Sequence, residues 1–155
     1  MTGPASILPL EMRHVSFAAS GETLLKGIDC SLEAGSRTVV IGPNGAGKTL
    51  FLRLCHCLIQ PSTGEVLWHG AGQRDPARHQ TMILQRPVLL RRTVAANVEY
   101  ALSVKGVPRR ERGAIVAEVL ARTGLSRLAL QQARRLSAGE QQKLALARAW
   151  AIKPQ

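Results

Sequence analysis

Residues 42–49 read Gly-Pro-Asn-Gly-Ala-Gly-Lys-Thr, and this stretch decides the fold. It satisfies the pattern G-x-x-x-x-G-K-[ST], which forms a phosphate-binding loop when it follows a strand and opens a helix. Both flanks have that character. The β-branched run at residues 38–41 predicts a short buried strand, and residues 49–58 carry leucines at helical spacing. The sequence therefore predicts a nucleotide-binding loop between a strand and a helix.

Each residue type in this loop has a physical role. The glycines let the backbone bend so that several N–H groups converge on an anion, and the following helix adds the positive end of its dipole. Lys48 supplies a mobile charge for the outer phosphates, and the Thr49 hydroxyl is a ligand for Mg²⁺. The residues expected to bind the phosphates of the nucleotide are Gly42, Asn44, Gly45, Ala46, Gly47, Lys48 and Thr49.

The rest of the chain reads as strands first and helices afterwards. Alternating residues from 10 to 17 and an extended stretch up to residue 32 predict an antiparallel pair, with further strands at 66–68 and 81–84. Helices are predicted over 93–104 and 108–122, capped by Thr93 and with Pro108 in a first turn. Ser137 and Glu140 form an S-x-x-E capping box that opens a last helix before Pro154.

A second motif extends this interpretation. Residues 136–140, Leu-Ser-Ala-Gly-Glu, continue into Gln141-Gln142-Lys143, and together they resemble the signature motif of ABC transporter ATPase subunits. Gln85 follows the 81–84 strand, where that family has its Q-loop glutamine. The resemblance covers nearly the whole chain and implies an α/β P-loop NTPase fold of ABC type, with an incomplete parallel-sheet core, antiparallel N-terminal strands and a helical lobe. The implied parts are a core at 1–84, a helical subdomain at 85–136 and a signature helix at 137–155.

The resemblance also implies roles and partners. Gln85 would contact the metal or the attacking water, while Ser137 and Gly139 would bind the γ-phosphate of ATP held by a second ATPase subunit in a head-to-tail dimer. Transmembrane permease subunits would dock on the helical lobe. Residues 85–98 resemble importers, and the signature region resembles those of tungstate and phosphate importers. The alternative for Ser137 and Glu140 is an ordinary capping box without a ligand.

Several positions depart from the family pattern. Ala19 stands where the family has an aromatic residue that stacks on adenine, and Phe17 is either a substitute or a core residue. Ala138 replaces a glycine, and Glu140 replaces a frequent glutamine with an acid; both changes are expected to weaken the dimer.

The family also supplies a strand that ends in Asp-Glu, and this sequence has no aspartate after Asp75. Hydrolysis needs carboxylates that orient the metal and the water. We therefore expect a truncated chain in which the remainder of the core is absent, and which hydrolyses ATP poorly or not at all.

Composition restricts the alternatives. The formal net charge is +11, and residues 74–135 hold much of it, which suits nucleic acid, acidic lipid, an acidic protein or simply a solvated surface. Aromatic residues are only 3% of the chain, so no stacking platform for bases is available and no nucleic-acid partner is expected. A soluble ABC-type ATPase acting on nucleic acid or ribosomes, and a non-hydrolysing ATP-binding fragment, remain the alternative functions.

The chain carries no apolar run long enough to span a membrane, and its first ten residues lack the charge and the apolar stretch of a secretory signal. A cytoplasmic location is expected, and the resemblance places it at the inner face of the membrane. Cys55 and Cys57 lie two positions apart on a predicted helix, so they point in different directions and suit core or interface thiols better than a metal site.

Overall fold

The computed structural model describes residues 6–70 and 75–154, which form two compact units that divide after Thr81. Pro4, in the N-terminal segment, and Arg74, in the basic segment, lie outside the described residues. Each unit has a hydrophobic core of its own.

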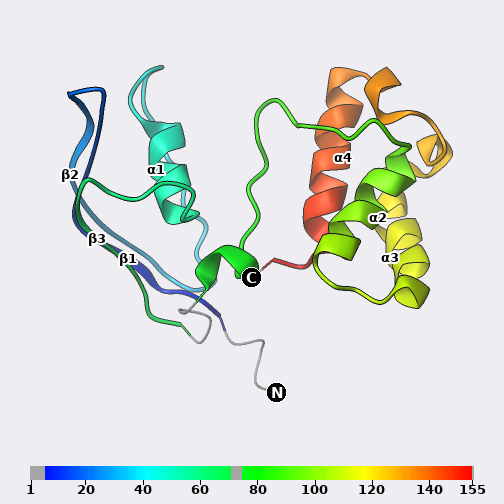
Figure 1. The fold of residues 1–155 in the computed structure, drawn as a ribbon, viewed down its shortest axis with the longest axis horizontal. Helices are drawn as coiled ribbons and strands as arrows, with labels where there is room; N and C mark the ends of the chain where they lie inside the picture. The colour runs from blue at the N-terminus through cyan, green and yellow to red at the C-terminus, as the bar shows by residue number, and fades with distance from the viewer. Residues whose placement is uncertain (1–5, 71–74, 155) are drawn as a thin grey trace. The chain divides into compact units, whose positions relative to one another are not determined.

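The first unit is built on an antiparallel sheet. Strands β1 (Leu10–Ala19), β2 (Glu22–Leu32) and β3 (Thr63–Trp68) are drawn in Figure 1. They form one sheet in the order β2-β1-β3. The register shifts between Met12 and Val15, where His14 has a φ of 48°. This irregularity lets Val15 join Leu10 and Met12 in the core, because an extra residue reverses the alternation of faces along a strand.

Helix α1 (Lys48–Cys55) covers this sheet. Leu54 and Cys55 are its buried residues, and they belong to the same core cluster as Leu10, Met12 and Leu25. The helix ends three residues before the predicted end at 58. A short 3₁₀ helix, Pro76–His79, follows later in this unit.

Two predicted strands are wrong. Residues 38–41 and 81–84 are not strands, and Val39 and Ile41 are 78% and 88% exposed rather than buried. A strand forms only where a neighbouring strand accepts and donates its backbone hydrogen bonds. Within the described ranges the only sheet is β2-β1-β3, so no parallel neighbour pairs with either segment.

The second unit is helical. It contains α2 (Val94–Val104), α3 (Arg109–Arg122) and α4 (Ala138–Ala151), with 3₁₀ turns at Ser126–Leu128 and Ala133–Arg135 (Figure 1). The side chain of Thr93 accepts the N–H of Ala96 and caps α2 as predicted. Pro108 is the residue before α3 rather than part of its first turn. The three helices share one core, to which each contributes buried aliphatic side chains.

None of the helices in the described part of the chain is long and apolar enough to cross a membrane.

Candidate nucleotide-binding site

The loop at residues 42–49 has the backbone geometry of an anion cradle. Gly45 and Gly47 have φ values of 86° and 83°, in the left-handed region that glycine adopts without strain. Gly47 is the N-cap of α1, and no side chain accepts a hydrogen bond from the start of that helix. The first turn of α1 also holds no acidic residue. The N–H groups at this helix end are therefore available to an anion.

Lys48 lies across the loop and bonds to its beginning. Its Nζ atom donates to the carbonyl oxygens of Gly42 and Pro43, at 2.8 and 2.7 Å. These bonds keep the ammonium group beside the loop backbone, where a phosphate would bind. The neighbouring Thr49 is exposed, so its hydroxyl is accessible to a ligand.

The space around the glycines suits a close backbone approach. A Cβ atom at Gly45 would meet nothing within 4 Å, whereas one at Gly47 would lie 2.4 Å from Cδ2 of Leu25. Gly47 thus packs directly against the sheet, and Gly45 leaves open space above the loop. A phosphate group fits this arrangement of glycines, helix end and lysine.

Ser137 and Gly139 belong to the start of α4, in the other unit. The hydroxyl of Ser137 donates to Oε2 of Glu140 at 2.7 Å, and its backbone N–H donates to the same oxygen at 2.8 Å. The N–H of Glu140 donates back to the Ser137 hydroxyl at 3.4 Å. The predicted capping box is present, and Gly139 is exposed beside it.

These contacts set the charge at the start of α4. The hydroxyl of Ser137, followed by its backbone N–H, lowers the pKa of the Glu140 carboxyl below its ordinary value. Glu140 is therefore an anion at neutral pH, hydrogen bonded to the serine that the sequence assigns to phosphate.

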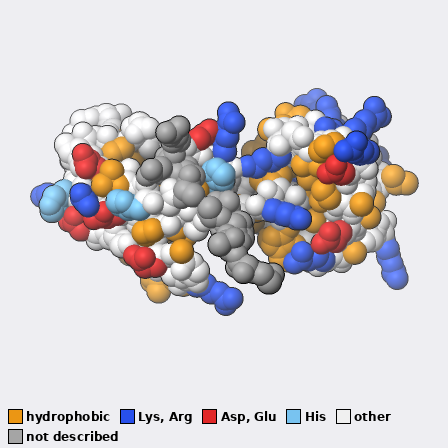
Figure 2. Space-filling model, turned by 90° about the horizontal axis from the view of Figure 1, so that it is seen from below, with side chains coloured by type: hydrophobic (Ala, Val, Ile, Leu, Met, Phe, Trp, Pro, Cys, Tyr) orange, Lys and Arg blue, Asp and Glu red, His pale blue; other side chains and the backbone are white. Residues whose placement is uncertain are grey.

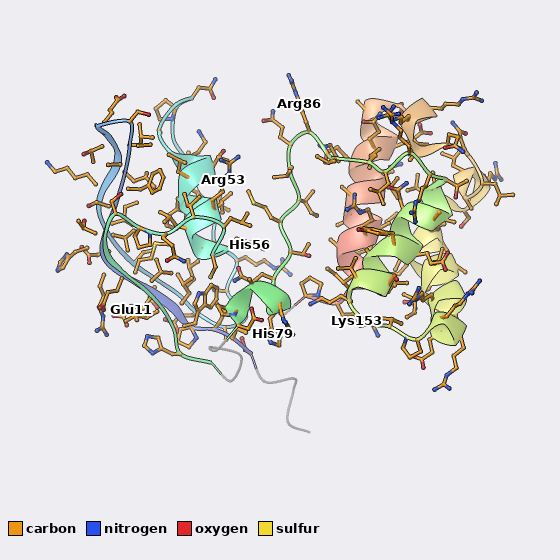
Figure 3. The ribbon with its side chains drawn as sticks, viewed as in Figure 1. Glu11, Arg53, His56, His79, Arg86 and Lys153 are labelled. Atoms are coloured by element: carbon orange, nitrogen blue, oxygen red, sulfur yellow. The ribbon has the colours of Figure 1, made fainter. Side chains whose placement is uncertain are left out.

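Gln85 lies in the same unit as α4 and is held through its backbone. Its carbonyl oxygen accepts a hydrogen bond from Nε2 of Gln142, and Arg148 donates to the carbonyl oxygen of Val88 at 2.7 Å. A hollow of about 440 Å³ lies beside these contacts, lined by Gln85, Arg86, Pro87, Ala138, Gly139, Gln141 and Gln142. Arg86 projects away from its loop (Figure 3). The Gln85 side chain is exposed, so the structure fixes the position of its backbone.

Asn97 is a site-supporting residue that the sequence interpretation missed. It is fully buried at the start of α2, where its side-chain oxygen accepts the Leu90 N–H at 2.9 Å. Its amide nitrogen donates to the carbonyl oxygens of Leu90, Arg92 and Thr93. The segment after Gln85 is thereby fixed to α2. A lone asparagine in a helix gives no sequence signal for such a role.

The remaining candidates fall outside the loop. Phe17 packs against the core of the first unit, and Ala19 is exposed at the end of β1.

Burial raises the pKa of the Cys55 thiol to about 12, so this side chain stays protonated. In the described ranges, no group of three or more His, Cys, Asp or Glu side chains is placed to hold a metal ion.

Basic side chains gather over the helical unit, as Figure 2 shows for one face. The arginines of this unit are mostly exposed, and the ion pairs there are on the surface, such as Arg122 with Glu118 at 3.6 Å. Arg122 also lies 4.6 Å from the ring centroid of Trp150. Surface pairs of this kind contribute little to stability, so the positive charge is available to a partner.

A glycine-rich loop, a lysine across it and an uncapped helix start define a P-loop nucleotide-binding protein. Comparison with known proteins agrees: a family model described as ABC transporter matches residues 25–155. The Tungstate uptake system ATP-binding protein TupC of Peptoclostridium acidaminophilum is 38% identical over 147 residues, which cover 95% of this chain and 69% of that protein. The chain belongs to the ABC transporter family of ATP-binding subunits.

Other relatives carry related names. A Methionine import ATP-binding protein MetN of Xanthomonas euvesicatoria is 37% identical, covering 96% of this chain and 48% of that protein. A Taurine import ATP-binding protein TauB of Pseudomonas entomophila is 34% identical, covering 96% of this chain and 58% of that protein. The chain thus spans about half to two thirds of the length of the curated relatives it matches.

Solved structures show the same fold. The structure of an ATP binding subunit of an ABC transporter superposes with a TM-score of 0.81 at 22% identity, covering 95% of this chain and 63% of that one. The cbiO1 protein of Clostridium perfringens is described as part of the ABC transporter complex cbiONQ. It superposes with a TM-score of 0.79 at 24% identity, covering 94% of this chain and 62% of that one. The predicted fold class, an α/β P-loop NTPase of ABC type, is confirmed, although only its antiparallel strands form a sheet in the described residues.

Proposed function

We propose that this chain is the ATP-binding part of an ABC importer, in which ATP binding and hydrolysis drive solute uptake. The observation that carries the proposal is the geometry of the loop at residues 42–49. Lys48 bonds across this loop, and no side chain caps the N-terminal end of α1. The names of the relatives, which concern tungstate, methionine and taurine import, favour an importer. An inorganic anion such as tungstate is the solute that the TupC likeness favours.

In this proposal the loop residues bind the triphosphate. The backbone N–H groups from Asn44 to Lys48 surround the β-phosphate, and Lys48 leaves the carbonyl oxygens of Gly42 and Pro43 to contact the outer phosphates. The Thr49 hydroxyl would hold Mg²⁺, which would neutralise phosphate charge, and Gln85 would contact the metal or the attacking water.

The second half of the site comes from another copy. Ser137 and Gly139 bind the γ-phosphate of ATP held by the loop of a partner ATPase subunit, in a head-to-tail dimer. Permease subunits dock on the helical unit, so the assembly lies at the inner face of the membrane. The exposed arginines of the helical unit favour a partner surface that carries acidic groups.

We also infer that a polypeptide of these 155 residues binds ATP without efficient turnover. The sequence after Asp75 contains glutamates but no aspartate. In the described helices, Glu111 and Glu118 form surface ion pairs and Glu140 belongs to a capping box. Phosphoryl transfer to water needs carboxylates directed at the metal and the nucleophile.

The test is ATP binding and turnover by the purified chain. Isothermal titration with MgATP should give one site per chain, and Lys48→Ala should weaken it, while phosphate release stays close to the uncatalysed rate. Co-purification with a membrane protein supports the importer, and co-purification with RNA favours the soluble alternative. Absence of any heat with MgATP contradicts nucleotide binding, and rapid phosphate release contradicts the inferred lack of turnover.

A further inference from the structure

The side chain of Ser137 is already occupied in this structure. Both of its hydrogen-bond donors, the hydroxyl and the backbone N–H, are directed at one oxygen of Glu140, at 2.7 and 2.8 Å. The hydroxyl oxygen in turn accepts the N–H of Glu140. The four groups form a closed ring of hydrogen bonds within the first turn of α4.

A phosphate oxygen that binds this serine must replace a carboxylate oxygen. The hydroxyl has a single proton to donate, so it cannot serve Glu140 and a phosphate together. The carboxylate also stays close to the phosphate after it is displaced, and two anions a few ångströms apart repel each other. The contact therefore opposes phosphate binding twice, by competition for the proton and by charge.

We propose that Glu140 restrains the ATP-dependent dimer by holding the Ser137 hydroxyl, so that this position sets how much ATP is needed to close two subunits. The inference rests on the proposed function of Ser137. Glu140 is a positioning residue here: it acts through Ser137, which is the group that touches the nucleotide.

Glutamine at position 140 separates the charge from the helix cap. Gln has the size of Glu and completes a capping box equally well, because its side-chain oxygen also accepts the Ser137 N–H. It has no negative charge, and its amide group can donate to a phosphate oxygen. Glu140→Gln therefore removes the negative charge from the proposed restraint while α4 keeps its start.

The experiment measures MgATP-dependent self-association of the chain by sedimentation velocity, for the wild type, Glu140→Gln and Ser137→Ala. We expect Glu140→Gln to dimerise with an apparent Kd at least fivefold lower than the wild type, and Ser137→Ala to dimerise more weakly. The matched control is Glu99→Gln, at an exposed position of α2, which removes the same charge from the same unit and should leave the Kd unchanged.

Other measurements keep the outcomes distinct. The melting temperature of Glu140→Gln should equal that of the wild type, which shows that the cap is intact. Binding of a fluorescent ATP analogue to the monomer should be the same in both, because the Lys48 loop is unaltered; loss of that binding in every variant would contradict the proposed function itself. An unchanged dimer Kd in Glu140→Gln, or no self-association in any variant, would overturn the role of Glu140.

Discussion

Lys48 closes the loop that it belongs to: its Nζ atom lies 2.8 Å from the carbonyl oxygen of Gly42, six residues earlier in the chain. The lysine thus contacts the beginning of the loop while its backbone begins α1. In this arrangement one side chain ties both ends of the loop together. The present acceptors of the ammonium group are carbonyl oxygens of the loop itself. A phosphate bound in the loop can therefore replace them as acceptor through a movement of the Lys48 side chain alone.

Replacement of Lys48 by alanine should weaken MgATP binding by roughly ten- to a hundredfold, the range for one hydrogen bond to a charged group. Titration of a fluorescent ATP analogue measures the affinity. Arg53→Ala is the control, because Arg53 is exposed on the same helix and carries the same charge (Figure 3). Equal losses in the two variants would mean that only net charge matters and that Lys48 has no specific role.

Gly64 should tolerate alanine far less well than Gly21. Both have positive φ angles, 80° and 81°, so alanine should cost about 1–2 kcal/mol at each for the backbone conformation alone. A Cβ atom at Gly64 would also lie 2.4 Å from the carbonyl oxygens of Arg13 and His14, whereas one at Gly21 meets nothing within 4 Å. We expect Gly64→Ala to cost about 3 kcal/mol or more in urea unfolding. Equal costs would contradict the close approach of Gly64 to β1.

Asn97→Ala should destabilise the helical unit by about 1–3 kcal/mol, since it leaves the Leu90 N–H without its acceptor and removes the side-chain bonds to the carbonyl oxygens of residues 90, 92 and 93. Trp150 reports on this unit, and Trp68 lies in the other one. Unfolding followed by fluorescence in a Trp68→Phe background therefore measures the effect on the helical unit. Asn97→Asp should be at least as harmful, because a carboxylate faces three carbonyl oxygens. A small loss of unfolding free energy in both variants would contradict the role of the Asn97 side chain in fixing residues 90–93 to α2.

The apolar run at residues 38–41 should contribute little to the stability of this chain. Val39→Thr and Ile41→Thr alter exposed side chains, so each should change the free energy of unfolding by no more than about 0.5 kcal/mol. Leu54→Ala, at a position only 1% exposed, should cost about 2–5 kcal/mol. Denaturant unfolding with β-sheet circular dichroism compares them. A large effect of the threonine variants would show that residues 38–41 are buried after all.

Alkaline pH should destabilise the first unit through Cys55. Its pKa is raised to about 12 by burial, above the value of 9.0 for the free side chain, so the folded state keeps a proton that the unfolded state loses. The contribution is fully present below about pH 9 and is lost as the pH rises toward 12. Cys55→Ser should flatten this part of the curve, and Cys55 should react with a thiol reagent at pH 8 only after unfolding. If Cys55→Ser left the pH dependence of the unfolding free energy unchanged, Cys55 would not be the cause of the alkaline loss of stability.

The local features that the sequence predicts well are those whose cause lies within a few residues. The hydroxyl of Thr93 and the Ser137–Glu140 box bond to N–H groups three positions away, so a short pattern is enough to locate both helix starts. The glycines of the loop work the same way, since a left-handed φ at Gly45 and Gly47 depends on the absence of a Cβ atom. The ABC family resemblance rests on these same short motifs.

Features that depend on a partner far along the chain required the structure. Residues 38–41 have strand composition, but a strand needs a neighbour in space, and the described chain offers none. The Gln142 bond to Gln85 spans 57 positions, and the four hydrogen bonds of Asn97 depend on where the 90–93 segment turns. The sequence by itself thus determined the shape of the glycine-rich loop, the helix caps and the family, because short-range bonds and backbone sterics dictate them. Only the tertiary structure decided which strands pair and what holds the Gln85 backbone, because long-range hydrogen bonds form only once distant segments have been brought together.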